Sequence, residues 1–208
     1  MSFEELMKKV TEKYSLEKLE NRMLPSGKHS RWGDSSEQGF IWHGEKFNDV
    51  MKKDYDFLES VSKDYFEMAS LASDVLGIKG VKHRIKFPTI GDFKIVKPVA
   101  FGFQSCPFGC EWEKDEFGYD SVGGSDVYIY EKDVNFAEGA SLDCNIERLM
   151  ARDAFLIVPA LAPHLIATHG LFQGRTAYRT DPTKLLEFWE RVGDKRKDRA
   201  NYVKSFFE

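Results

Sequence analysis

The sequence predicts an α+β fold in which a mixed β-sheet is flanked by helices. Apolar residues keep helical spacing over most of residues 1–78, and from about Gly80 the pattern changes to strand-like alternation. Farther along, residues 127–158 read as strand, helix and strand, which is the order of a βαβ unit with parallel strands. We expect one domain over residues 1–208, with an N-terminal helical segment (1–78) and a sheet with C-terminal helices (79–208).

Composition indicates a globular chain rather than a disordered one. Hydrophobic residues make up 42% and charged residues 31% of the 208, and 17 phenylalanines supply bulky core material. A net charge of −4 argues against nucleic acid as the main partner. The acidic start MSFEELMKKV is not a signal peptide, and no apolar run reaches the roughly 20 residues that cross a bilayer. We therefore expect a cytoplasmic protein without a membrane partner.

The N-terminal segment predicts three helices. Ser2 and Glu5 have capping-box spacing at the start of the first helix, which breaks near Ser15 and ends by Leu24, the residue before a proline. Residues 26–40 are predicted to form a long surface loop. Residues 47–76 keep helical spacing throughout, so a single helix of about 45 Å is expected, which must cross the domain or bend.

Several short apolar runs between residues 84 and 158 read as strands. Residues 84–87, 93–96 and 99–103 alternate between turn signals and suggest a meander, and residues 127–130 resume a strand after a second loop. A short helix is expected after Ser141 or Asp143. The unbroken apolar run 154–158 is typical of a buried strand, and Pro159 ends it because proline has no N–H to donate. Asp181 followed by Pro182 predicts the start of a further helix.

The first candidate site lies where polar side chains follow these last strands. If residues 127–130 and 154–158 are parallel neighbours, the side chains after both strands lie at one edge of the sheet, where ligands bind in open sheets. Histidine can act as a base, carboxylates can orient it, and arginines can hold a phosphate or carboxylate. The catalytic candidates are His164, Glu131 and Asp133, and the ligand-binding candidates are Arg175, Arg179, His169 and Gly174.

Structural roles compete with these assignments. His164 and His169 are five positions apart, about 140° around an ideal helix, so they do not share a face in the way that i and i+4 ligands do. Pro163 makes His164 an early helical residue, and His169 precedes a glycine that can end the helix. Asp181 has the position of a helix cap.

The second candidate site is the segment Cys106-Pro-Phe-Gly-Cys110, which has a cysteine spacing that zinc tolerates. Tetrahedral closure needs two further ligands, and Cys144 with one histidine could complete a Cys3His set. The alternative is a tight connection in which the cysteines serve as small apolar residues.

Two functions follow from these sites. The first is a small enzyme or binding protein for an anionic, phosphorylated or nucleotide-like compound, with the His/Arg/carboxylate set as its site. The second is a non-catalytic interaction or regulatory module, stabilised by zinc, that binds a protein partner through its N-terminal helices. The basic run at residues 195–199 could contact nucleic acid, but Asp194 and Asp198 dilute its charge. Dinucleotide, serine-hydrolase and HExxH metalloprotease motifs are absent from the sequence.

Overall fold

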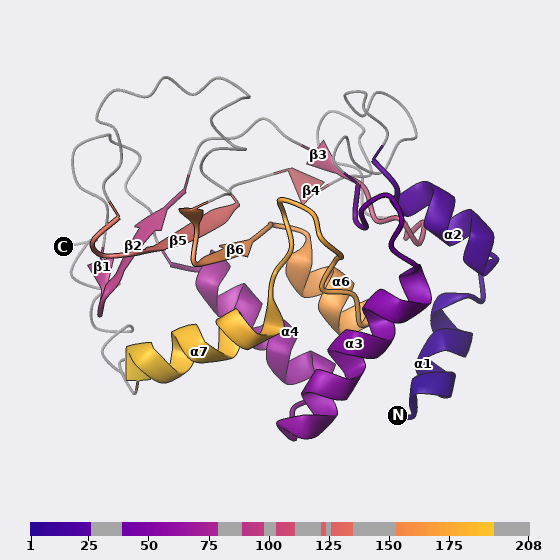
Figure 1. The fold of residues 1–208 in the computed structure, drawn as a ribbon, viewed down its shortest axis with the longest axis horizontal. Coiled ribbons are helices and arrows are strands. Elements are labelled where there is room, and N and C mark those ends of the chain that lie inside the picture. The colour runs from indigo at the N-terminus through magenta and orange to yellow at the C-terminus, as the bar shows by residue number, and fades with distance from the viewer. Residues whose placement is uncertain are drawn as a thin grey trace.

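The structure of the chain is a computed structural model that describes residues 1–25, 39–78, 89–97, 103–110, 122–123, 126–134 and 153–193. Helices and an antiparallel sheet alternate with loops, and the predicted α+β class is confirmed (Figure 1). The elements are α1 (Phe3–Val10), α2 (Leu16–Met23), α3 (Phe47–Ser60), α4 (Tyr65–Leu76), β1 (Thr89–Ile90), β2 (Phe93–Val96), β3 (Phe103–Gln104), β4 (Val122–Gly123), β5 (Val127–Glu131), β6 (Leu156–Val158), α6 (Ala162–His169) and α7 (Pro182–Val192).

The main sheet has the order β1-β2-β5-β6, and all of its neighbouring strands are antiparallel. In the register, Ile129 of β5 lies between Ile95 of β2 and Leu156 of β6. β5 and β6 are neighbours, as predicted, but the predicted parallel βαβ pairing is wrong. The spacing between the strands could not reveal this, because a connection of that length can return to either end of a strand. The helix predicted after Ser141 lies outside the described residues.

Because β5 and β6 are antiparallel, their carboxyl ends lie at opposite edges of the sheet. Ala160, which follows β6, donates its N–H to the carboxylate of Asp126, which precedes β5, at 3.0 Å. Glu131, at the far end of β5, instead pairs with Phe93 at the start of β2. The first candidate site was predicted on the premise that these two strands are parallel, and that premise is wrong.

The two N-terminal helices form as their capping residues predict. The hydroxyl of Ser2 accepts from the N–H of Glu5, and the Glu5 carboxylate accepts from the N–H of Ser2 at 2.7 Å. Ser15 caps α2, because its hydroxyl accepts from the N–H of Lys18, and Leu24 at the other end is extended, as the residue before a proline usually is. The predicted break near Ser15 is confirmed.

The helix predicted over residues 47–76 is two helices, α3 and α4, which meet at an angle (Figure 1). Ser62 between them has a φ of +53°, which ends the helical path. Asp64 then caps α4, because its carboxylate accepts from the N–H of Glu67 at 2.7 Å while the Glu67 side chain accepts from the N–H of Asp64. The D-x-x-E spacing of this capping box was present in the sequence and marks the break.

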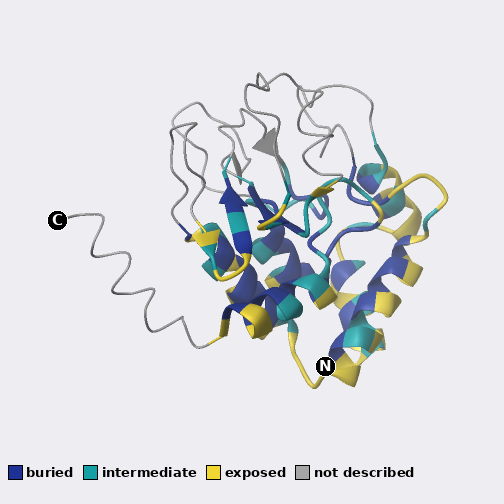
Figure 2. Ribbon diagram, turned by 60° about the vertical axis from the view of Figure 1, so that its left-hand side comes forward, coloured by how far each residue is buried: buried dark blue, intermediate teal, exposed yellow. Residues whose placement is uncertain are grey.

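The helix α6 contributes residues to two apolar cores. Figure 2 shows that buried residues run through the middle of the molecule, with exposed residues on the outer faces of the helices. Ala162 and Ile166 face the core that packs α4 and α7 on the sheet. Leu161 and Leu165 face a second core, formed with α1, α2 and the turn that contains Cys106. Helix α6 is thus fixed on both sides, and its histidines are held next to the cysteine turn.

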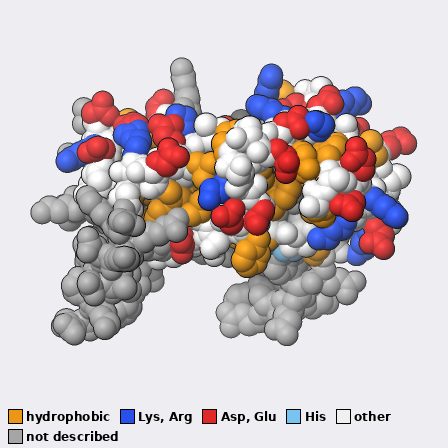
Figure 3. Space-filling model, turned by 90° about the horizontal axis from the view of Figure 1, so that it is seen from below, with side chains coloured by type: hydrophobic (Ala, Val, Ile, Leu, Met, Phe, Trp, Pro, Cys, Tyr) orange, Lys and Arg blue, Asp and Glu red, His pale blue; other side chains and the backbone are white. Residues whose placement is uncertain are grey.

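The outer surface is mixed in character. Seen from below, apolar side chains reach the surface between acidic and basic ones (Figure 3), and the exposed apolar residues include Val61 and Phe66 near the turn between α3 and α4. Within the described ranges, every helix is too short or too polar to cross a membrane.

Candidate metal centre

Two cysteines and two histidines that were predicted to serve different sites meet at one place. Cys106 and Cys110 follow β3, and His164 and His169 lie near the start and at the end of α6. The four potential ligand atoms, one from each side chain, all lie within 4.8 Å of one another. Cysteine sulfur and imidazole nitrogen are the donors of structural zinc sites.

The cysteines are brought together by a tight turn. The N–H of Gly109 donates to the carbonyl of Cys106 at 3.0 Å, and Gly109 has a φ of +71°. A side chain at this position would also collide with Tyr14, because a Cβ on Gly109 would lie 2.6 Å from the Tyr14 hydroxyl. Glycine is therefore required here, and the turn directs both sulfurs toward α6.

The N-terminal helices hold the backbone of this turn. The guanidinium of Arg22 donates to the carbonyl of Pro107 at 2.6 Å, and the ammonium of Lys13 donates to the carbonyl of Gly109. The ring of Phe108 stacks on the imidazole of His169 with 3.9 Å between ring centres and 13° between planes. Contacts made by Arg22, Lys13 and Phe108 therefore hold the cysteine turn in place, and the cysteine side chains take no part in them.

The histidines approach each other despite their unfavourable spacing along the helix. Their ring centres are 5.2 Å apart, with 74° between planes. Side chains on a helix lean toward its N-terminus, so His169, at the last helical position, reaches back toward His164. Gly170 follows with a φ of +67° and ends the helix, as predicted. The offset of about 140°, which argued against a shared site for these histidines, therefore does not prevent their rings from meeting.

One nitrogen of His169 faces both sulfurs. Its Nε2 lies 3.4 Å from Sγ of Cys106 and 3.2 Å from Sγ of Cys110. A neutral imidazole nitrogen has either one proton or one lone pair, so it cannot complete a hydrogen bond with each sulfur at once. Around a tetrahedral zinc ion, sulfur and nitrogen ligands lie about 3.5 Å apart, from Zn–S of about 2.3 Å and Zn–N of about 2.0 Å. The observed separations are close to those of a metal site.

His164 is oriented by its own helix. Its Nδ1 lies 3.4 Å from the hydroxyl of Thr168, one turn later. When Nδ1 carries the proton and donates it to this hydroxyl, Nε2 has the lone pair that binds a metal. Such outer hydrogen bonds commonly fix the tautomer of a metal-binding histidine.

Burial disfavours the charged forms of three of the four side chains. It lowers the pKa of His169 to about 3, with further lowering from His164 and Lys9, and it also lowers the pKa of His164. Burial raises the pKa of the Cys106 thiol to about 12. Neutral imidazole is the form that binds metals, whereas each thiol must lose its proton when a cation binds.

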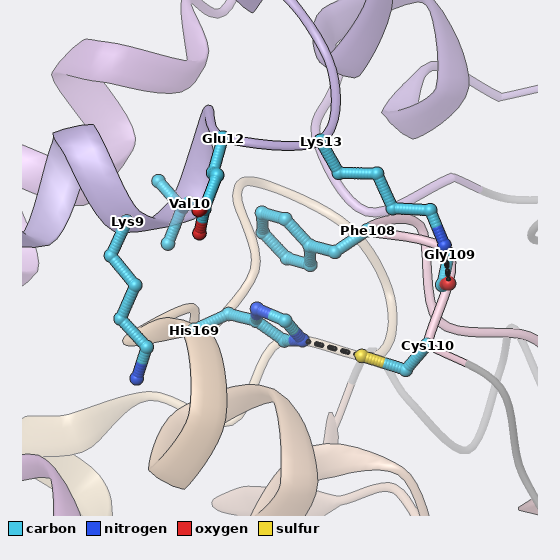
Figure 4. A pocket seen from close by; sticks show the side chains of 8 residues that line it. All are labelled: Lys9, Val10, Glu12, Lys13, Phe108, Gly109, Cys110 and His169. Atoms are coloured by element: carbon cyan, nitrogen blue, oxygen red, sulfur yellow. Dashed lines mark hydrogen bonds between the residues drawn. The ribbon is translucent and has the colours of Figure 1, made fainter.

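A hollow of about 380 Å³ opens onto one side of the centre, lined by Lys9, Val10, Glu12, Lys13, Phe108, Gly109, Cys110 and His169. Figure 4 shows the His169 ring and the Cys110 sulfur in contact at the hollow, 3.2 Å apart, with Phe108 beside them. Cys106 is only 2% exposed, whereas Cys110 is partly exposed. Solvent therefore reaches the two thiols unequally.

The other predicted site residues lie in separate ion pairs and turns. Glu131 accepts two hydrogen bonds from Arg191 at 2.6 and 2.8 Å, which hold its pKa below the usual range. Arg179 binds Asp54. Asp181 caps α7, as its position predicted, because its carboxylate accepts from the N–H groups of Thr183 and Lys184.

The remaining members of the predicted set do not converge on His164 either. Arg175 has a side chain that is 88% exposed, and its Nε lies 3.8 Å from the carboxylate of Glu45. Gly174 packs against the same glutamate, since a Cβ there would lie 2.3 Å from the Glu45 carboxylate. Asp133 is exposed in the turn after β5. Of the residues predicted for the first candidate site, only His164 and His169 lie at the metal centre.

The four ligands were all singled out in the sequence, but they were divided between two sites. C-x3-C and H-x4-H both fall within zinc-ligand spacing, which is the signal that could have joined them. The sequence predicted that one unspecified histidine joins the cysteines but did not indicate both, because residues 111–163 intervene, far more than in a short zinc module. Arg22, Lys13 and Phe108, which support the turn, had no sequence signal. Cys144 and the 195–199 run lie outside the described residues.

Comparisons with protein-family models, with curated proteins and with solved structures find no match for this chain. The fold and the centre define an α+β protein with a candidate Cys2His2 metal site. What the centre does is therefore inferred from its geometry and chemistry.

Proposed function

We propose that this chain is a zinc-binding protein whose Cys2His2 centre is structural rather than catalytic. The observation that carries the proposal is the approach of both Cys106 Sγ and Cys110 Sγ to the same Nε2 of His169, at 3.4 and 3.2 Å. His164 supplies a fourth donor within 4.8 Å of the others. The function is that of a zinc-stabilised, non-catalytic module, the second of the two expected from the sequence.

Donor chemistry favours zinc over other common cations. Two thiolates and two imidazoles suit a tetrahedral, borderline-soft ion, whereas magnesium and calcium prefer oxygen ligands. Two thiolates also balance the double positive charge, so the loaded centre carries no net charge. A neutral centre is favoured here because Cys106 and His169 are both buried, and a net charge away from water costs free energy.

Ligand number supports a structural role. Four protein donors fill a tetrahedral shell, while catalytic zinc sites keep one position open for water or substrate. The centre joins a turn after β3 to α6, and α6 borders both cores. A bound ion would therefore fasten the cysteine turn to the middle of the fold, beside α1 and α2.

An enzyme for an anionic compound, the first expected function, has less support. Glu131 and Arg179, two of its key groups, are engaged with Arg191 and Asp54. A protein partner for the N-terminal helices remains a proposal that accompanies the zinc module, and the large apolar residues exposed in that segment include Leu16, Val61 and Phe66.

Metal analysis of protein purified without chelators tests the proposal directly. We expect one zinc ion per chain by plasma mass spectrometry, with loss of most of the metal in Cys106→Ser and His164→Ala. His43→Ala is the matched control, because His43 is an exposed histidine outside the centre. A wild-type protein without stoichiometric metal would contradict the proposal.

A further variant separates the two possible ligand sets. Cys144→Ser keeps its zinc if the ligands are Cys2His2 and loses it if Cys144 belongs to a Cys3His set. Cobalt substitution adds a spectroscopic readout, since tetrahedral Co²⁺ with two thiolates shows strong visible d–d bands and a sulfur charge-transfer band. Weak octahedral-type bands in reduced, cobalt-loaded protein would count against a four-ligand protein site.

A further inference from the structure

The two cysteines of the centre differ in their access to solvent. Cys110 lines the hollow of about 380 Å³, while Cys106 does not line it and is 2% exposed. Their sulfurs lie within 4.8 Å of each other, as members of one ligand cluster. A small reagent that enters the hollow therefore meets one thiolate first, with a second close behind it.

We propose that Cys106 and Cys110 form an oxidation site, at which a peroxide converts the zinc-bound thiolates to a disulfide and expels the ion. The inference rests on the proposed zinc centre. It assigns to that centre a regulation that a purely structural site does not need. Under oxidising conditions, loss of the ion would break its link between the cysteine turn and the histidines of α6.

The chemistry balances with hydrogen peroxide as the oxidant. The Cys110 thiolate attacks one peroxide oxygen, the O–O bond breaks, and hydroxide leaves, giving a sulfenic acid. The Cys106 thiolate then attacks the Cys110 sulfur, the S–S bond forms, the S–O bond breaks, and a second hydroxide leaves. Two thiolates are oxidised by two electrons, and one peroxide is reduced to two hydroxides, which are protonated by the buffer.

Zinc makes both steps feasible at this site. The thiolate rather than the thiol is the reactive species, and a bound zinc ion holds both sulfurs deprotonated. The two sulfurs already lie within 4.8 Å of each other, so rotation of the side chains can bring them together while Arg22 and Lys13 still hold the backbone of the turn. After the disulfide forms, two imidazoles alone remain, and they cannot retain the ion.

The experiment uses full-length, zinc-loaded Cys144→Ser protein, in which Cys106 and Cys110 are the only cysteines. Zinc content and free thiols are measured before any oxidant is added. Hydrogen peroxide is then added with a chromogenic zinc chelator, and the products are mapped by peptide mass spectrometry. A parallel reaction contains dimedone, which traps sulfenic acids.

We expect release of one zinc per chain, loss of both thiols, and a peptide that links Cys106 to Cys110. Dimedone should label Cys110 in preference to Cys106. Dithiothreitol with added zinc should restore the thiols and the bound metal. Wild-type protein should release zinc to the same extent.

Two results would overturn the inference while leaving the zinc proposal intact. One is retention of zinc with both thiols intact under peroxide, and the other is oxidation to sulfinic acids without a Cys106–Cys110 link. Absence of zinc before peroxide is added would instead overturn the proposed function, and the inference with it.

Discussion

The guanidinium of Arg179 donates two hydrogen bonds to the carboxylate of Asp54, at 2.5 and 3.1 Å, across 125 residues of chain. The side chain of Asp54 is 2% exposed and that of Arg179 is 16% exposed, so both charges are largely removed from water. Burial raises the pKa of Asp54, and the Arg179 hydrogen bonds oppose this with a smaller effect. The pair joins α3 to the segment between α6 and α7.

Removal of one partner from this pair should strongly destabilise the fold. We expect Asp54→Ala to lower the free energy of unfolding by about 3–5 kcal/mol, because it removes the closest carboxylate of the largely buried Arg179 and leaves only the longer pair with Asp181, at 3.8 Å, among the described ion pairs. Urea unfolding of the two proteins measures the difference. Asp56→Ala is the matched control, since Asp56 lies on the same helix in an exposed i,i+4 pair with Lys52 and should change stability by roughly 0.5 kcal/mol or less. Similar losses in both variants would show that the buried pair has no special role.

Much of the fold could be predicted from local sequence. The Ser2–Glu5 capping box, the stop before Pro25, the end of β6 before Pro159 and the Asp181 cap are set by neighbouring residues, and all are confirmed. Strand direction was not predictable in this way. Whether β5 and β6 run parallel depends on the path of a long connection, which short-range patterns do not specify.

The candidate site could be predicted as residue types but not as an arrangement. The spacing of Cys106 and Cys110 indicated zinc, and the histidines were identified as polar groups after a buried strand. Their meeting depends on the packing of α6 between two cores, a long-range property of the fold.

The prediction of one long helix over residues 47–76 was wrong for a local reason. A capping box at Asp64 starts a new helix there, although the apolar pattern continues through it.

Metal removal should destabilise the whole protein if the centre binds zinc in the folded state only. At a zinc concentration 1,000 times the dissociation constant, a ligand of this kind adds about 4 kcal/mol to the free energy of unfolding. Thermal unfolding of zinc-loaded protein before and after chelation should therefore show a lower Tm after chelation. The double variant Cys106→Ser/Cys110→Ser serves as the control and should have one Tm in both conditions.

Gly109 should matter for metal affinity beyond its effect on backbone strain. Alanine is disfavoured at its φ of +71°, at a cost of roughly 1–2 kcal/mol, and the added Cβ displaces Tyr14. Gly91→Ala is the matched control, because Gly91 has a φ of +58° and nothing within 4 Å of its Cβ. We expect Gly109→Ala to lose at least as much stability as Gly91→Ala in the metal-free state, because only Gly109→Ala also displaces Tyr14. Only Gly109→Ala should weaken zinc binding, by about 10- to 100-fold in competition with a chelator, as changes in the support of metal ligands do. Equal zinc affinities in the two variants would show that the conformation of the Gly109 turn does not support the metal ligands.

Acid should destabilise the metal-free protein through His169. The folded-state pKa of this residue is lowered to about 3, whereas an unfolded histidine titrates near pH 6.5. Between these values the unfolded chain binds one more proton than the folded chain at this position, so the free energy of unfolding decreases as pH falls, by up to about 1.4 kcal/mol per pH unit. This contribution is fully present above pH 6.5 and is lost as the pH approaches 3. His164 shifts in the same direction.

Urea unfolding of chelator-treated protein between pH 7 and pH 5 measures this slope. His169→Gln should have a shallower slope than wild type, because glutamine does not titrate, while the exposed His43→Gln should keep the wild-type slope. The comparison of slopes removes contributions from other groups, such as Asp54, whose raised pKa acts in the opposite direction and whose contribution is lost as pH rises. Identical slopes in wild type and His169→Gln would mean that this imidazole accepts a proton in the folded chain as readily as in water. The ring would then not be held between Phe108 and the two cysteines in the metal-free protein.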